Sequence, residues 1–111
     1  MMIIEQKEGY IYVSSNDDSF DDFLTNFKNE HPVIEKKNTI ISISDNFKVK
    51  EEDIFVFLHY SQKHKENGTT FVIICDDVNI DNFPEEFNIV PTLKEAEDVL
   101  EMENIERDLG F

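Results

Sequence analysis

The chain has 111 residues, the size of one small domain, and its ten basic and 25 acidic residues give a net charge of −15. Hydrophobic residues make up 40% of the sequence and ten residues are Phe, so an ordered core is expected. No run of about 18 apolar residues is present, which argues against a membrane-spanning helix. The negative charge argues against nucleic acid and anionic membranes as partners and allows a basic protein partner.

The N-terminal segment, MMIIEQKEGYIYV, has neither a basic leader nor a long apolar stretch. We therefore expect no secretory signal. The single cysteine, Cys75, cannot form an internal disulfide, which fits a reducing compartment. These features together predict a cytoplasmic protein.

The first half of the chain begins with a predicted strand pair and a helix. Residues 2–15 read as two short strands around a Glu8-Gly9 turn, with alternating faces in the second strand. Residues 19–31 carry Phe and Leu at helical spacing after a capping Ser19, and Pro32 is expected to end this helix. The second strand is expected to place Ile11 and Val13 on one face and Tyr10 and Tyr12 on the other.

The second half alternates strands with helices. The apolar run at 69–75 is typical of a central strand covered on both faces. Thr92-x-x-Glu95 predicts a capping box at the start of the last helix. The expected elements are a strand at 39–44, a helix at 51–67, a strand at 69–75, a connection with at most one helical turn at 76–87, a strand at 88–90 and a final helix from 93. This order predicts one α/β domain over residues 1–111, with a mixed sheet of four or five strands and about three main helices.

Three stretches carry a resemblance to a known family. They are NTIISISDNFKVKEEDI at 38–54, HKENGTTFVIICD at 64–76 and FNIVPTLKEAEDVL at 87–100. In this order they resemble the STAS domain, the family named for sulphate transporters and anti-sigma factor antagonists. The resemblance implies a STAS-like fold and a protein that acts by binding other proteins. The short 76–87 connection leaves little room for the additional helix that the family has before its last strand.

The resemblance also bears on phosphorylation. In the anti-sigma factor antagonists the helix after this strand begins Asp-Ser-Ser-Gly, and a serine there accepts a phosphate that controls partner binding. This chain has Lys50, Glu51, Glu52 and Asp53 at those positions, so the phosphoacceptor is missing. Glu51 or Glu52 could hold a permanent negative charge at the helix start, where free N–H groups favour anions. The simpler interpretation is a charged first turn with no regulatory role. In either case we predict no phosphorylation switch here.

A narrower resemblance is to small acidic bacterial proteins with C-terminal segments like EMENIERDLGF, some of which are named ribonuclease Z. That name implies an RNA-processing enzyme or an accessory subunit of one. The metallo-β-lactamase family that ribonuclease Z resembles needs a His-x-His-x-Asp-His run to hold two metal ions. Here His31, His59 and His64 are scattered and no such run exists. We therefore expect no enzyme activity, no catalytic residue and no cofactor.

Three aspartates follow the predicted central strand and form the weak candidate metal site. Asp76, Asp77 and Asp81 would lie at the carboxyl edge of the sheet, where ligands gather in α/β proteins and carboxylates suit Mg²⁺. Solvated loop acids are the simpler interpretation, so we expect no metal. This loop is also the mouth that a third alternative, a small-ligand-binding α/β protein, would use.

The last helix carries apolar residues on two sides. At about 100° per residue, Ala96 and Leu100 share the face of Leu93, whereas Met102, Ile105 and Leu109 fall on the opposite face. One buried face cannot cover both sets. Either the helix bends after Leu100, or it stays straight and presents Met102, Ile105, Leu109 and Phe111 to its own domain, a second copy or another protein. A third alternative is that the end is disordered.

The sequence therefore predicts a non-catalytic, regulatory protein-interaction module, binding another protein or itself as a dimer. Its predicted partner-binding residues are Glu51, Glu52, Asp53, Met102, Ile105, Leu109 and Phe111.

Overall fold

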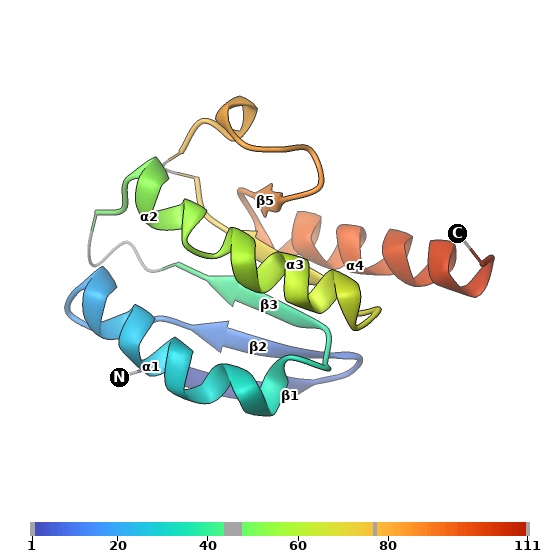
Figure 1. Ribbon diagram of the computed structural model, residues 1–111, viewed down its shortest axis with the longest axis horizontal. Coiled ribbons are helices and arrows are strands. Elements are labelled where there is room, and N and C mark those ends of the chain that lie inside the picture. The colour runs from blue at the N-terminus through green and yellow to red at the C-terminus, as the bar shows by residue number, and fades with distance from the viewer. Residues whose placement is uncertain (1, 44–47, 77, 111) are drawn as a thin grey trace.

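The computed structural model of the protein describes residues 2–43, 48–76 and 78–110. Figure 1 shows the arrangement of its elements. The strands are β1 (Ile3–Lys7), β2 (Tyr10–Ser14), β3 (Thr39–Ser42), β4 (Phe71–Ile74) and β5 (Asn88–Val90). The helices are α1 (Phe20–Ile34), α2 (Glu51–Phe55), α3 (Leu58–Glu66) and α4 (Leu93–Asp108), with a 3₁₀ turn, η1, at Ile80–Asn82.

The five strands form one mixed sheet in the order β1-β2-β3-β4-β5. The first pair is an antiparallel hairpin, and every later pair is parallel. The predicted fold class, α/β with a mixed sheet of four or five strands and about three main helices, is therefore confirmed, and the sheet has five strands. Parallel neighbours require crossover connections, which α1, the α2–α3 pair and the η1 segment provide.

Register explains why both faces of the sheet are apolar. Val13, Ile41, Ile73 and Ile89 pair across β2 to β5 in one row, and each is at most 4% exposed. These β-branched side chains face α1, α2 and α3, as the alternation in β2 predicts.

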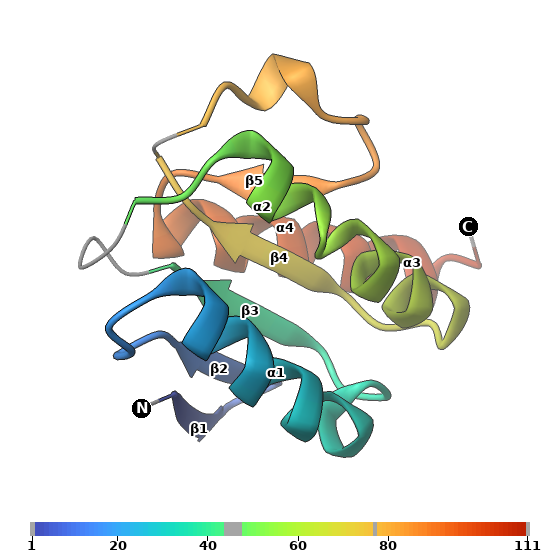
Figure 2. The same ribbon diagram turned by 60° about the vertical axis from the view of Figure 1, so that its left-hand side comes forward.

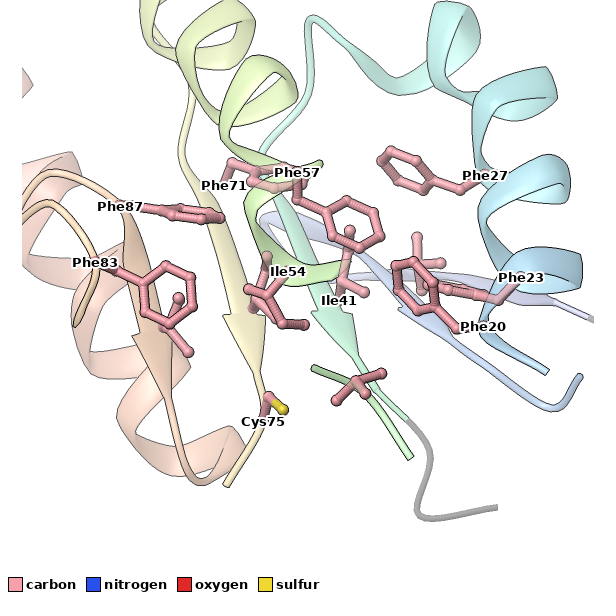
Figure 3. Close-up of a cluster of buried hydrophobic side chains, with 14 of the residues drawn as sticks. Phe20, Phe23, Phe27, Ile41, Ile54, Phe57, Phe71, Cys75, Phe83 and Phe87 are labelled. Carbon is pink, nitrogen blue, oxygen red and sulfur yellow. The ribbon is translucent and has the colours of Figure 1, made fainter. Parts of the chain in front are cut away.

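Phenylalanines fill the space between this face and the helices. From α1, Phe20, Phe23 and Phe27 turn toward Phe57, whose ring centroid lies 5.2 to 6.2 Å from theirs (Figure 3). Aromatic rings at such separations favour tilted and edge-to-face contacts, and the observed rings adopt these. This cluster is the main core of the molecule.

The opposite face of the sheet is covered by α4 (Figure 2). Ala96 and Leu100 pack with Ile40 and Val72, whereas Ile3 on β1 stays 42% exposed. The helix lies over β4 and β5, so the hairpin side of this face is less covered. Ser42 is only partly buried on this side.

Four local predictions need correction. The helix expected at 51–67 is divided: α2 ends at Phe55, and i→i+3 bonds, such as Phe57 N–H to the Ile54 carbonyl, tighten the turn before α3. Pro32 does not end α1, which runs to Ile34. Pro32 is exposed and lies in the last turn of the helix, whereas Ile34 is buried in the core. Burial of Ile34 therefore favours continuing the helix past Pro32. The strand expected at 39–44 ends at Ser42, and Ser44 lies outside the described residues. The strand expected at 69–75 is shorter, Phe71–Ile74.

Other local predictions are confirmed. The side chains of Ser19 and Thr92 accept the N-terminal helix bonds expected of them, from the N–H groups of Asp22 and Glu95. The 76–87 connection contains η1 and no longer helix within its described residues. In the part of the chain that the structure describes, no helix is long and apolar enough to cross a bilayer.

Candidate functional site

The C-terminal helix α4 is a single element from Leu93 to Asp108, and it exposes its second apolar face. Ala96 and Leu100 are buried against the sheet, and Glu103 and Arg107 continue the same side. The other set points away from the sheet: the exposed fractions of Met102, Ile105 and Leu109 are 55%, 52% and 67%. The alternative in which these three residues dock on their own domain is therefore wrong. Phe111 lies outside the described residues.

The second half of α4 is fixed by polar contacts to the sheet. Glu103 accepts hydrogen bonds from the Thr70 hydroxyl (2.8 Å) and from the Asn88 amide (2.9 Å). Arg107 Nη2 also donates to the Thr70 hydroxyl, at 3.0 Å. Thr70 is only 1% exposed, so its hydroxyl needs these partners. The bonds anchor the part of α4 after Leu100, which has no buried apolar side chain. The exposed apolar face is thereby held on a rigid element.

An acidic hollow of about 320 Å³ lies beside this face, between α4 and the β1–β2 hairpin. Its floor is apolar and its rim is negatively charged. The apolar residues are Tyr10, Leu100 and Ile105, and the rim carboxylates are Glu8, Glu97, Glu101 and Asp108. Ile105 belongs both to the hollow and to the exposed face of α4, so the two form one continuous surface. We call this combined surface, with Met102 and Leu109, the α4 surface.

Tyr10 of β2 connects the sheet to α4 within this hollow. Its hydroxyl donates a hydrogen bond to Glu97 Oε2 at 3.0 Å. Burial, and then the hydrogen bond and negative charge of Glu97, raise the pKa of Tyr10 to about 12. The hydroxyl therefore keeps its proton across the physiological pH range and holds the Glu97 carboxylate in place.

The three acids at the start of α2 are used differently from one another. Glu51 binds the η1 segment: its carboxylate accepts from Asn82 Nδ2 at 2.8 and 3.0 Å and from the Asn79 N–H at 3.3 Å. Asp53 reaches back to the Lys50 N–H at 3.0 Å, a capping contact. Glu52 is exposed.

The two groups of predicted partner-binding residues do not meet. Buried Ile54 places α2 on the face of the sheet that carries α1 and α3, whereas Leu100 places α4 on the other face (Figure 2). The acids of α2 and the apolar residues of α4 therefore form two separate surfaces.

The aspartates after β4 do not converge on a metal site in the described residues. Asp76 and Asp81 are exposed, and Asp77 lies outside the described residues. Across 2–43, 48–76 and 78–110, no group of three or more His, Cys, Asp or Glu side chains is placed to hold a metal ion. Cys75 is buried at the end of β4, in the main core.

The sequence reasoning missed a buried histidine pair. His31 on α1 and His64 on α3 are 3% and 0% exposed, and their Nε2 atoms lie 3.1 Å apart. Burial, and then the neighbouring charge of His31, lower the pKa of His64 to about 4, while the Lys37 carbonyl opposes this shift. Burial also lowers the pKa of His31, against the raising effect of Glu35. Both rings are therefore neutral near pH 7.

No protein-family model matches this chain, and no curated protein matches it in sequence. The geometry of the described side chains is thus the basis for the functional proposal.

Proposed function

We propose that this protein is a non-catalytic, cytoplasmic interaction module that binds a basic, amphipathic segment of another protein through the α4 surface. One observation carries the proposal: a helix anchored to the sheet by Leu100 and Glu103 exposes Met102, Ile105 and Leu109 on its outer side. Contact between the apolar face of an amphipathic helix and an apolar surface of another protein is a recurrent mode of recognition.

Charge supports a basic partner over a second copy. Within Leu93–Asp108 there are seven acidic residues and two basic ones, Lys94 and Arg107. Lys94 already pairs with Asp98 at 2.8 Å. Two copies meeting through this surface would bring four rim carboxylates of each hollow toward those of the other, which is unfavourable. In a partner with lysines or arginines flanking apolar residues, the cations would pair with the rim carboxylates and the apolar residues would pack on the floor of the hollow.

The resemblance to STAS domains is compatible with this role. It supports an interaction function without a phosphoserine, because Glu51 and Glu52 stand where the phosphoacceptor would be. In this proposal the first turn of α2 is not part of the main contact, since Glu51 already binds Asn79 and Asn82.

The experiment uses a synthetic helical peptide with leucine at i, i+3 and i+4 spacing and lysine elsewhere, titrated into the ¹⁵N-labelled full chain. We expect saturable chemical-shift changes along α4 around Ile105 and Leu109. Ile105→Ser and Leu109→Ser should each weaken binding about tenfold, which is roughly 1.4 kcal/mol.

Val33→Ser is the matched control, because Val33 is 68% exposed on α1, away from the α4 surface. A lysine–glycine peptide of the same charge tests whether charge alone is sufficient. Equal binding of the two peptides, or an equal effect of Val33→Ser, would contradict the proposal. So would a concentration-dependent dimer that Ile105→Ser dissociates in sedimentation experiments, since the second copy would then be the occupant.

A further inference from the structure

A second hollow, of about 380 Å³, is lined by positively charged residues, although the protein as a whole is negatively charged. It lies at the amino-terminal edge of the parallel strands, where four segments meet: the β1–β2 hairpin, the loop at 36–38, the turn at 68–69 and the end of α4. Its lining includes Lys36, Lys37 and Arg107 and no carboxylate among the described residues. We call it the basic hollow.

This charge pattern is unusual for the chain. Acidic residues outnumber basic ones by 25 to ten, yet three cations and no described acid line this site. Four other hollows formed by described residues include acidic side chains, among them Glu103, Asp17, Asp81 and Glu97. A local group of cations within one Debye length, about 10 Å at 0.1 M salt, can attract a small anion even on a negative protein.

Arg107 is held in a fixed orientation at the floor of the basic hollow. Its Nη2 donates to the Thr70 hydroxyl at 3.0 Å and to Asn104 Oδ1 at 2.6 Å. Its Nη1 is 3.8 Å from Glu103 Oε1, a long ion pair. The side chain is 30% exposed, so part of the guanidinium reaches the hollow. Because both protons of Nη2 are used in these two bonds, Nη1 and Nε carry the donors that remain for a phosphate oxygen.

The loop that carries the two lysines is fixed as well. Asn38 donates from its amide to the Gly9 carbonyl at 3.2 Å and accepts from the Thr70 N–H at 2.8 Å. The Lys37 N–H donates to the Ile34 carbonyl, and the Lys37 carbonyl accepts from the Thr39 hydroxyl. The backbone of Lys37 is thus held beside the hollow, and the side chains of both Lys36 and Lys37 are exposed.

We propose that the basic hollow binds a small phosphate-bearing ligand, with Arg107 as the oriented donor and Lys36 and Lys37 as the flanking charges. Three cations offset the charge of a phosphate dianion. The volume exceeds the needs of the phosphate group alone and falls in the range of small-ligand sites, about 300–1,000 Å³. Gly9, Tyr10 and Ile11 line the hollow beside the cations, so the group that carries the phosphate would lie against this part of the β1–β2 hairpin. This inference does not depend on the proposed function of the α4 surface.

The test is a titration of the ¹⁵N-labelled full chain with inorganic phosphate, and separately with phenyl phosphate, at constant ionic strength. We expect saturable shifts at Lys36, Lys37 and Arg107 and none around Asp22 in the acidic hollow of α1. Lys36→Ala and Lys37→Ala should each weaken binding about tenfold, as for the loss of one charge-assisted hydrogen bond. The control is Lys28→Ala, at an exposed lysine of α1 outside the hollow.

The two probes distinguish the sources of the phosphate. Tighter binding of phenyl phosphate, with added shifts at Tyr10 and Ile11, assigns the site to a phosphorylated small molecule. Equal binding of the two probes, with shifts confined to the cations, assigns it to free phosphate. Shifts that do not saturate, or that Lys28→Ala reduces as much as Lys37→Ala does, would overturn the proposal, since the anion would then only screen surface lysines.

Discussion

The Nε2 atoms of His31 and His64 lie 3.1 Å apart in the core, and a second contact determines which of them donates. The Thr69 hydroxyl donates to the His64 carbonyl at 3.1 Å and lies 3.0 Å from His64 Nδ1. Since a hydroxyl has one proton, Thr69 accepts at its oxygen from a protonated Nδ1. His64 Nε2 is then an acceptor, and His31 donates from its own Nε2. Protonation of His64 at Nε2 would remove this acceptor and break the bond.

This arrangement predicts acid sensitivity. Unfolded histidines take up protons near pH 6.5, whereas native His64 does so only near its pKa of about 4. Stability from this group is therefore complete above pH 6.5 and is lost as the pH falls toward 4.

Other charges face the pair from several elements and modify its titration. Glu35 raises the pKa of His31, while Lys63 and His59 lower it. Histidine ¹H–¹³C spectra recorded from pH 8 to pH 4 measure the effect directly, with exposed His59 as the reference. A His64 curve that coincides with that of His59 would contradict the prediction.

Glu51 and Glu52 are adjacent acids with different expected effects. Glu51→Ala removes the carboxylate that binds Asn79 and Asn82, so we expect faster hydrogen exchange in the η1 segment. Because these contacts are exposed, global stability should fall by less than about 1 kcal/mol. Glu52→Ala is the matched control and should leave η1 exchange unchanged. Equal exchange in both variants would show that Glu51 does not hold the segment.

The spacing of apolar residues correctly predicted which side chains share a face of a single strand or helix. The alternation in β2 placed Ile11 and Val13 opposite Tyr10, and the spacing in α4 placed Ile105 opposite Leu100, as observed. Such patterns show which side of a helix or strand is apolar, and that side is the one expected to be buried.

Contacts between distant segments were not predictable in the same way. His31 and His64 are 33 residues apart, and their pairing depends on how α1 packs beside α3. Sequence spacing can relate His64 only to His59, which lies on the same helix, and not to His31. The bond from Glu51 to Asn82 likewise joins residues 31 apart. No Gly or Pro marks the break between α2 and α3, so the sequence carries no sign of it. The break instead accompanies i→i+3 bonding and the burial of both Ile54 and Phe57.

Phe57 and Phe55 give a paired test of the core. Phe57 is fully buried among the rings of α1, whereas Phe55 is 40% exposed and contacts Phe83. Phe57→Ala should lower the free energy of unfolding by about 4 kcal/mol, and Phe55→Ala by about 1 kcal/mol.

Chemical denaturation with circular dichroism measures both changes. Phe57→Leu removes less volume than Phe57→Ala and should cost more than Phe55→Leu, so it keeps the comparison possible if Phe57→Ala does not fold. Similar losses in Phe57→Leu and Phe55→Leu would contradict the placement of Phe57 at the centre of the core.

Glu103 provides the last prediction, because it anchors the half of α4 that has no buried apolar residue. Glu103→Ala removes the acceptor of the Thr70 hydroxyl and of the Asn88 amide, and Thr70 is only 1% exposed. A buried donor without its acceptor costs about 1–3 kcal/mol, so a loss of that size is expected in the free energy of unfolding. Glu101→Ala, at an exposed acid on the same helix, should change it by less than about 0.5 kcal/mol. We also expect faster amide exchange from Met102 onward in Glu103→Ala and not in Glu101→Ala. If the two variants behave alike, the polar anchor is not what keeps the apolar face of α4 presented to solvent.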